Sequence, residues 1–351
     1  MTSNAEPQGP GSGPQPPYPL HPSIQDKLDP VYAAFYNKHL INQQQVHLRP
    51  VSASRTSGVL IPGAGPELPV GKVEDISIKR RETEGPDVLV RAFTPEGEKP
   101  EKGWPLMVYY HGGGWVLGNI NTENVVCTNL CNRAKCVVVT VDYRLAPEDP
   151  YPAAVHDSWE ALLWLNAEGP AHLSLDLSRS AVGGSSAGGN LAAIMCHKAL
   201  SAPSLVPKFS TQLLLVPVMD NTALPSTTLS WKENEFTPAL PAEKMLWYRR
   251  HYLPDEKTWG EPEASPLLYG NGSGEWGRLP RALIVVGELD VLRSEGEEYA
   301  AKLEENGVKA DLKIMKGMPH PFLAMDGALQ QGKDAITFMV EALKDAFGGE
   351  K

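Results

Sequence analysis

Short apolar runs alternate with stretches of helical periodicity along most of the chain. The segments 106–110 (LMVYY), 136–143 (CVVVTVDY) and 281–287 (RALIVVG) are nearly continuous apolar runs. Such runs are typical of strands that are covered on both faces of a parallel sheet. Two earlier segments, 73–79 (VEDISIK) and 87–93 (DVLVRAF), also have the composition of strands. They predict a hairpin ahead of the parallel strands.

Helical periodicity separates these strands. The clearest example is 151–169, where Val155, Trp159 and Leu162 fall on one helical stripe and a glycine ends the segment. The same pattern predicts helices at 122–134, 187–200, 293–306 and from about 331, and further strands at 179–184, 211–219 and 310–315. Strands separated by helices predict the α/β class, with a mainly parallel central sheet that helices flank on both faces.

Two segments interrupt this alternation. Residues 23–60 precede the first strand, and the stretch from about 220 to 265 lies within a long insert between two strands. The insert carries many large aromatic side chains: Trp231, Phe236, Trp247, Tyr248, Tyr252 and Trp259. Large rings outside a sheet indicate a helical cap over a pocket, or the small core of such a cap. We therefore expect one domain over 23–351, with its cap formed by these two segments.

The bulk composition narrows the class of partner. The chain has 351 residues and a formal net charge of −10, which argues against nucleic acid or an anionic membrane as the main partner. No apolar run has the length of a membrane span, so we expect no membrane anchor. Residues 1–22 are rich in Pro and Gly and lack the features of a signal peptide, which predicts a disordered tail and a cytoplasmic protein. A monomer or a homodimer fits these properties.

Two sequence features could suggest a bound group. Cys127, Cys131 and Cys136 lie close together in sequence, but no His or acidic residue stands beside them at ligand spacing, so buried thiols are the better interpretation. The segment 272–277 (GSGEWG) fits a dinucleotide-binding pattern, yet it neither follows a buried strand nor opens a helix. We expect neither a metal nor a cofactor.

Two adjacent serines lie between a predicted strand and a predicted helix, in the segment 182–190 (VGGSSAGGN). A nucleophilic serine on a tight strand-to-helix turn needs small residues two positions before and after it, because the two backbones nearly touch there. Centred on Ser186, both positions are glycines, whereas Ser185 would have Gly183 and Ala187. The spacing favours Ser186 as the nucleophile.

A serine hydroxyl needs a base to take its proton and a carboxylate to orient that base. The acid and then the histidine are expected to follow the serine along the chain. His320 lies in a Gly- and Pro-rich loop after the last predicted strands, in the segment GMPHPF. The segment GELDVLRSEG offers Glu288 and Asp290 as the acid, of which we prefer Asp290; Asp220 is a more distant alternative.

A glycine-rich segment, HGGGW (111–115), follows the predicted strand LMVYY directly. Hydrolysis of an acyl bond places negative charge on the former carbonyl oxygen, and backbone N–H groups can stabilise it. Only glycines let the main chain come close enough to donate them. We therefore assign the oxyanion hole to the N–H groups of Gly113, Gly114 and Ala187.

Taken together, several separate motifs resemble those of the hormone-sensitive-lipase-like family of α/β-hydrolases. They are HGGGW, VDYRLAPE, YPAA, GSSAGGN, SPLL and DVLRSEG, and they span about residues 70–325. The resemblance implies an α/β-hydrolase fold, a cap from the N-terminal region and the late insert, and carboxylesterase activity on short or medium acyl chains. It also implies structural roles for Asp142 and Arg144. The chain departs from the family at Ser185, where an acid is usual, and at Val291, where proline is favoured.

Three functions remain open at this point. The first is a serine hydrolase of carboxylic esters, and the second is an amidase or formamidase that uses the same three residues. The third is a small-molecule receptor on an inactive hydrolase scaffold, which the presence of Ser186, Asp290 and His320 disfavours. A lipase of emulsified long-chain fat is less favoured, because no amphipathic surface helix is evident. The natural substrate and the residues that bind it cannot be read from the sequence.

Overall fold

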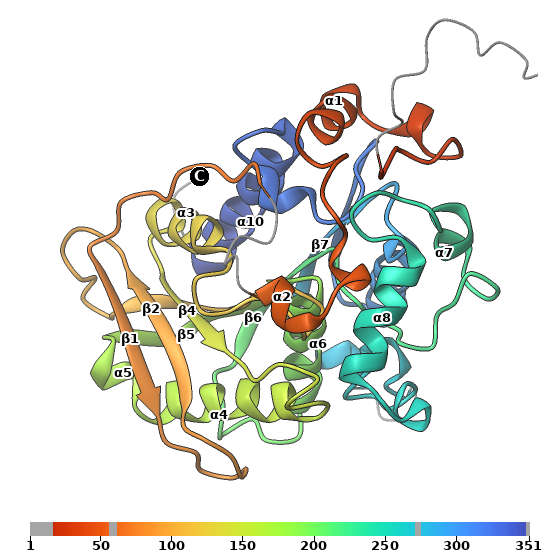
Figure 1. Cartoon of the computed structure of the whole chain (residues 1–351). Coiled ribbons are helices and arrows are strands. Elements are labelled where there is room, and N and C mark those ends of the chain that lie inside the picture. The colour runs from red at the N-terminus through yellow and green to blue at the C-terminus, as the bar shows by residue number, and fades with distance from the viewer. Residues whose placement is uncertain (1–16, 56–61, 271–274, 349–351) are drawn as a thin grey trace, which may run out of the picture.

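The fold is built on one eight-stranded sheet (Figure 1). The computed structural model describes residues 17–55, 62–270 and 275–348. The strands lie in the order β1-β2-β4-β3-β5-β6-β7-β8. Their bounds are β1 Lys72–Ile78, β2 Val88–Thr94, β3 Trp104–Tyr110, β4 Val137–Asp142, β5 Leu175–Ser185, β6 Phe209–Leu215, β7 Arg281–Gly287 and β8 Ala310–Met315. The predicted strands are all present in this sheet.

The strands pair as the sequence pattern predicts. β1 and β2 form the antiparallel hairpin, and β2 also pairs antiparallel with β4. From β4 to β8 all neighbouring strands are parallel. The mainly parallel α/β sheet is therefore confirmed. β6 is shorter than predicted: it ends at Leu215 and not near Met219, because Val216 takes a positive φ of 41° and turns the chain out of the sheet.

Helices cover both faces of the sheet (Figure 1). On one face lie α4 (Ala153–Ala167), α6 (Ala187–Ala199) and α9 (Arg293–Glu305), which share one buried apolar cluster with the sheet. On the other face lie α3 (Asn124–Ala134) and α10 (Gln330–Phe347), in a second apolar cluster. This arrangement is the one that strands separated by helices predict. The short helix α5 (Gly169–His172) follows α4.

The segment before the first strand divides into two parts. α1 (Pro30–His39) buries Tyr32 and Tyr36 in the apolar cluster that contains α10. The 3-10 helix η2 (Val46–Leu48) instead contacts α8 (Ala242–Tyr252) of the late insert, and α2 (Val51–Arg55) follows it. The second part thus contacts the insert, as the predicted cap requires; η1 (Gln25–Lys27) precedes α1.

Residues 1–16 of the predicted tail (1–22) lie outside the described residues. Within its last part, Tyr18 is tied to the structure that follows. The backbone N–H of Tyr18 donates to the carbonyl of Ile41, and its carbonyl accepts from the Tyr36 hydroxyl. The ordered chain therefore includes residues that we assigned to the tail. The segment GSGEWG also lies partly outside, since residues 271–274 are not described.

The late insert contains α7 (Leu229–Glu233), α8 and short 3-10 helices: η3 Glu256–Thr258, η4 Pro266–Leu268 and η5 Trp276–Arg278. Its aromatic rings have partners both inside the insert and outside it. Trp231 and Tyr252 are buried, and Tyr252 stacks on Trp115 at 4.3 Å between ring centroids. Phe236 is about half exposed and stacks on His21. Of the six aromatic residues of the insert, Tyr248 lines the pocket described below.

The structure also bears on the cysteines and on the metal and membrane features considered in the sequence analysis. Cys127, Cys131 and Cys136 are buried free thiols, as is Cys196. Within the described part of the chain, no group of three His, Cys, Asp or Glu side chains is placed to hold a metal ion. A search of the same residues finds no helix with the length and apolarity that crossing a membrane requires.

Candidate active site

The turn between β5 and α6 holds Ser186. Its backbone has φ 54° and ψ −117°, a conformation that costs free energy in a residue with a side chain. Its N–H donates to the carbonyl of Leu215, which fixes the turn against β6. The flanking glycines are required: a Cβ on Gly184 would lie 2.4 Å from the Tyr110 carbonyl oxygen, and one on Gly188 only 1.9 Å from it. The turn is thus centred on Ser186.

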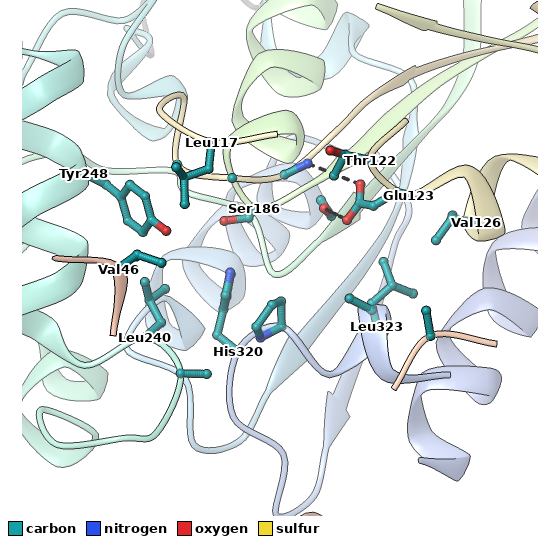
Figure 2. Close-up of a pocket in the computed structure, with 18 of the residues that line it drawn as sticks. Val46, Leu117, Thr122, Glu123, Val126, Ser186, Leu240, Tyr248, His320 and Leu323 are labelled. Atoms are coloured by element: carbon teal, nitrogen blue, oxygen red, sulfur yellow. Dashed lines mark hydrogen bonds between the residues drawn. The ribbon is translucent and has the colours of Figure 1, made fainter. Parts of the chain in front are cut away.

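Asp290 and His320 lie together beside this turn. The Nδ1 atom of His320 is 2.8 Å from Oδ2 of Asp290, and both side chains are buried. The other carboxylate oxygen accepts the backbone N–H of Leu292. A carboxylate accepts hydrogen bonds, so this contact favours the tautomer of His320 that carries its proton on Nδ1. Figure 2 shows the imidazole of His320 directed toward Ser186.

The two alternative acids lie elsewhere. Glu288 bonds to the ammonium of Lys316 and to the backbone N–H of Gly317, each at 2.8 Å, and Lys316 lowers the pKa of the Glu288 carboxyl. Asp220 bonds to the backbone and hydroxyl of Thr222. Neither carboxylate is bonded to His320, so the structure brings Asp290 alone of the three to the histidine.

The glycine-rich loop runs beside the serine turn. Gly113 has φ +123° and Gly114 φ +62°, and both line the same pocket as Ser186. A Cβ on Gly113 would lie 2.1 Å from the carbonyl oxygen of Leu117, so no other residue fits there. Ala187 is the first residue of α6, where backbone N–H groups have no partner within the helix. The three residues that we assigned to the oxyanion hole therefore come from the two loops that meet at this point.

Glu123 is a site residue that sequence reasoning missed. Its carboxylate accepts the hydroxyl of Ser185 at 2.5 Å, the hydroxyl of Tyr109 at 3.0 Å and the backbone N–H of Gly112 at 3.2 Å. Burial raises the pKa of the Glu123 carboxyl, although the bond from Ser185 opposes that rise. One acid thus joins the serine turn to the glycine-rich loop. It stands at the start of the helix that we predicted at 122–134, and no local signal marks it, because Tyr109 and Ser185 come close to it only in the folded chain.

Ser185, the other serine of the turn, lies against Glu123 and the glycine-rich loop. It is buried, and its hydroxyl is held by Glu123. A Cβ on Gly112 would lie 2.7 Å from that hydroxyl oxygen, so the loop and the turn are in close contact. An acid thus lies beside the serine turn, and it comes from a point 62 residues away in sequence.

These residues share a pocket of about 360 Å³. Figure 2 shows Ser186 and His320 near its centre. On one side lie Val46, Leu117, Leu240 and Tyr248, and on the other lie Thr122, Glu123, Val126 and Leu323. The pocket therefore extends in two directions from the serine, as a site for the two halves of a substrate requires.

The family resemblance implies structural roles for Asp142 and Arg144. Neither residue lines this pocket. The guanidinium of Arg144 bonds to Asp157 on α4, and Arg80 bonds to the same carboxylate. Asp142 ends β4, opposite Leu89 of β2. These residues connect the sheet to α4 and to the loop after β1.

Comparisons with known proteins agree with this fold. A family model described as the alpha/beta hydrolase fold matches residues 107–324. An AB hydrolase superfamily protein of Schizosaccharomyces pombe is 50% identical over 333 residues, which are 94% of this chain and 97% of that protein. Carboxylesterase NlhH of Mycobacterium tuberculosis is 37% identical over 263 residues, which are 74% of this chain and 79% of that protein. A solved structure, an esterase of Pyrobaculum calidifontis, is 32% identical with a TM-score of 0.78 and covers 91% of this chain and 98% of its own.

Proposed function

Because the chain belongs to the hormone-sensitive-lipase-like family of α/β-hydrolases, we propose that it cleaves carboxylic esters of short to medium acyl chains with Ser186 as the nucleophile. The protein is a carboxylesterase-type serine hydrolase. The hydrogen bond between the buried Asp290 and His320, beside a serine held at positive φ, is the observation that carries the assignment of residues.

In the first half of the reaction, His320 accepts the proton of the Ser186 hydroxyl as the oxygen attacks the ester carbonyl. Asp290 keeps the imidazole in the tautomer whose Nε2 is free, and it stabilises the imidazolium that forms. The N–H groups of Gly113, Gly114 and Ala187 stabilise the negative oxygen of the tetrahedral intermediate. The alcohol then leaves with the proton that His320 returns, and the acyl group remains on the serine.

In the second half, a water molecule repeats the attack on the acyl-serine, with His320 again taking and returning the proton. The pocket supports small substrates: about 360 Å³ is near the lower end of the roughly 300–1,000 Å³ common for ligand pockets. Its apolar lining on both sides of the serine suits the hydrocarbon parts of an ester.

Hydrolysis of p-nitrophenyl esters from acetate to dodecanoate tests this function. We expect the highest kcat/KM among the short and medium chains. Ser186→Ala should lower kcat by about 10⁶-fold, as loss of a nucleophile does in other serine hydrolases. Ser185→Ala, the matched neighbour, should keep turnover and react with a fluorophosphonate, which labels an activated serine. Loss of turnover and labelling in Ser185→Ala alone would overturn the assignment of the nucleophile.

The same assay separates esters from amides. The tetrahedral chemistry also serves an amide or a formamide, so N-formyl and arylamide substrates belong in the panel. A kcat/KM for the amide above that for the matched ester would replace the esterase assignment by an amidase. We further propose a cytoplasmic location, which the four free thiols support, and a monomeric or homodimeric state, which light scattering tests.

A further inference from the structure

The two ends of the pocket carry opposite charge. Its lining contains two cationic side chains, Arg49 and Lys244, and three acidic ones, Glu67, Glu123 and Asp326. Potential differences of this kind orient a charged ligand in a cleft, because low-dielectric walls focus the field. The position of each group relative to Ser186 therefore bears on which substrate the site prefers.

The cations lie at the cap end. Arg49 directly follows η2, which begins at Val46, and Lys244 stands on α8 one turn before Tyr248. Residues four apart share one face of a helix, so Lys244 and Tyr248 lie on the same face of α8. Val46 and Tyr248 are on the same side of Ser186 in Figure 2.

Two of the acids, Glu123 and Asp326, lie at the opposite end. Glu123 is beside Val126 and Leu323 in Figure 2. Asp326 follows the short helix η6 (Phe322–Met325), to which Leu323 belongs, and it accepts the backbone N–H of Gly65 at 2.9 Å. Charge and position thus divide the pocket into a cationic cap end and an acidic end beside α3.

Neither cation has an anionic partner within residues 17–55, 62–270 and 275–348. The ammonium of Lys244 donates to the carbonyl of Ala239 at 2.6 Å, and Nε of Arg49 donates to the hydroxyl of Ser54 at 3.1 Å. The neighbouring Arg55, by contrast, pairs with Glu148 at 2.8 Å. Burial, and then the charge of Arg49, lower the pKa of Lys244 to about 8. Two half-buried like charges are costly without a counterion, and a bound anion would offset that cost.

We propose that Arg49 and Lys244 bind a carboxylate of the substrate, so that the preferred ester carries a free carboxylate separated from the scissile carbonyl by a short aliphatic spacer. This inference rests on the proposed esterase function. The half-ester of an aliphatic dicarboxylic acid is the simplest compound of this class. The acidic end of the pocket repels the same carboxylate and so disfavours the reversed orientation.

The spacer follows from the geometry of α8. The ring of Tyr248 lies against the glycine-rich loop, since a Cβ on Gly114 would be 2.4 Å from its Cδ1. Lys244 lies four residues away on the helix, about 6 Å along the axis. Leu240 and Met245 line this part of the pocket, and their side chains suit methylene groups. A chain of a few methylenes therefore spans the distance from the serine to the cations.

Matched pairs of esters test the inference. On the acyl side the pair is monoethyl adipate and ethyl hexanoate; on the alcohol side it is ω-acetoxypentanoate and pentyl acetate. In each pair a carboxylate replaces a methyl group, so the ratio of the two kcat/KM values reports the carboxylate alone. We expect a ratio of about ten or more in one of the two pairs, the gain typical of a hydrogen bond to a charged group. Ratios of one or less in both pairs, with the neutral esters turned over, would overturn the subsite.

Variants of the cations sharpen the test. Lys244→Met and Arg49→Met should each bring the ratio down to about one, whereas Lys244→Arg should retain most of it. Arg250→Met is the matched control, because Arg250 is exposed on the same helix and lies outside the residues that line the pocket. A ratio that is unchanged in Lys244→Met and Arg49→Met would overturn the subsite.

A binding measurement separates this inference from the proposed function. Titration calorimetry of monoethyl adipate and ω-acetoxypentanoate into Ser186→Ala requires no turnover. Binding that is lost when Lys244→Met is added supports the subsite even if the wild type hydrolyses no ester, in which case the esterase function alone fails. Hydrolysis of neutral esters without any binding of the two carboxylate compounds would leave the esterase function standing and remove the subsite.

Discussion

One side of the pocket is built by loops at the carboxyl ends of the strands, and the other side by the cap; the two sides are held in different ways. On the sheet side, backbone groups fix the proposed catalytic residues: Ser186 donates its N–H to the carbonyl of Leu215, and Asp290 accepts from the N–H of Leu292. On the cap side, side-chain packing holds the wall. Tyr248, for example, packs edge-on against Trp247, with 5.0 Å between ring centroids.

The difference matches what each side has to do. Proton transfer and carbonyl attack tolerate errors of only a fraction of an ångström, which backbone bonds and closely approaching glycines can guarantee. Selection among acyl chains relies on apolar contact, which allows small adjustments at a modest cost in free energy. We therefore expect changes on the sheet side to lower kcat and changes on the cap side to alter substrate preference.

After the loss of the nucleophile itself, the largest effect on kcat is expected at Asp290, on the sheet side. Asp290→Asn should lower kcat by about 10⁴-fold, because the amide no longer holds His320 in the tautomer with a free Nε2. Glu288→Gln is the matched control: its carboxylate bonds to Lys316 and not to the histidine, so activity should change little. Steady-state kinetics on one ester measures both. Equal losses in the two variants would contradict the assignment of the acid.

The next effect concerns the buried acid that joins two loops of the sheet side. Glu123→Gln keeps the volume of the side chain but removes one acceptor from Ser185, Tyr109 and Gly112. Leaving a buried donor without a partner costs about 1–3 kcal/mol of the free energy of unfolding, which denaturant unfolding measures. We also expect kcat to fall about tenfold, since displacement of the glycine-rich loop weakens the stabilisation of the oxyanion.

A control and a contrary result make the Glu123 test specific. Glu263→Gln removes a surface partner of Lys198 and should change the free energy of unfolding by less than about 1 kcal/mol. Should Glu123→Gln be as stable and as active as the wild type, Glu123 would not connect the turn and the loop.

A fall in pH should lower the stability of the fold through His111, the first residue of the HGGGW segment on the sheet side. Burial lowers the pKa of His111 to about 4, well below the value near 6.5 of an unfolded chain. The folded state therefore binds fewer protons than the unfolded state between these values, so stability is complete above pH 6.5 and falls as the pH drops toward 4. For His111 alone we expect a loss of about 2 kcal/mol in the free energy of unfolding by pH 5. Denaturant unfolding at several pH values measures it.

His197 should add to this acid effect. Burial lowers its pKa to about 3, and its ring stacks on Tyr269 with 4.0 Å between centroids. His197→Phe keeps an aromatic ring without a titrating group, so its unfolding free energy should depend less on pH than that of the wild type. A stability that stays constant from pH 7 to pH 5 would show that these two histidines are not held neutral.

The smallest effect is expected on the cap side. Tyr248→Ala enlarges the pocket beside Gly114, so the preferred acyl chain should lengthen, with a gain of about three- to tenfold in the ratio of kcat/KM for a longer ester to that for a shorter one. Phe236→Ala, a ring of the same insert that is half exposed and does not line the pocket, should leave this ratio unchanged. An unaltered chain-length profile in Tyr248→Ala would place the acyl group elsewhere in the pocket.

Local sequence patterns were enough to predict most of the sheet. The continuous apolar runs of β3, β4 and β7 and the helical stripe of α4 each depend on residues close together in the chain, so their periodicity can be read directly. The boundary of β6 was placed too far along, because Val216 and the residues that follow it stay apolar after the chain has left the sheet. An apolar run indicates that a segment is buried. It does not show where the strand ends, because a buried loop has the same composition as a buried strand.

Only part of the candidate site could be predicted from the sequence. Ser186, Asp290 and His320 stand in segments whose glycines and prolines mark loops after strands, and the geometry of those turns depends on nearby residues. The cap was described only in outline: α1 packs with α10, and the aromatic rings of the insert have partners both inside it, as Tyr248 does in Trp247, and outside it, as Tyr252 does in Trp115. Aromatic composition predicts that the rings are buried, but it does not predict which residues they pack against.

The sequence by itself determined the class of fold, the order of the strands along the chain and the serine that occupies the turn, because each depends on periodicity or on spacing over a few residues. Only the tertiary structure placed Glu123 against Ser185, and brought Arg49 and Lys244 from separate segments to one end of the pocket. The physical reason is the range of the interactions. Backbone propensity and steric fit act between neighbours in the chain, whereas a buried carboxylate and a pair of cations acquire their roles from groups that only folding brings near.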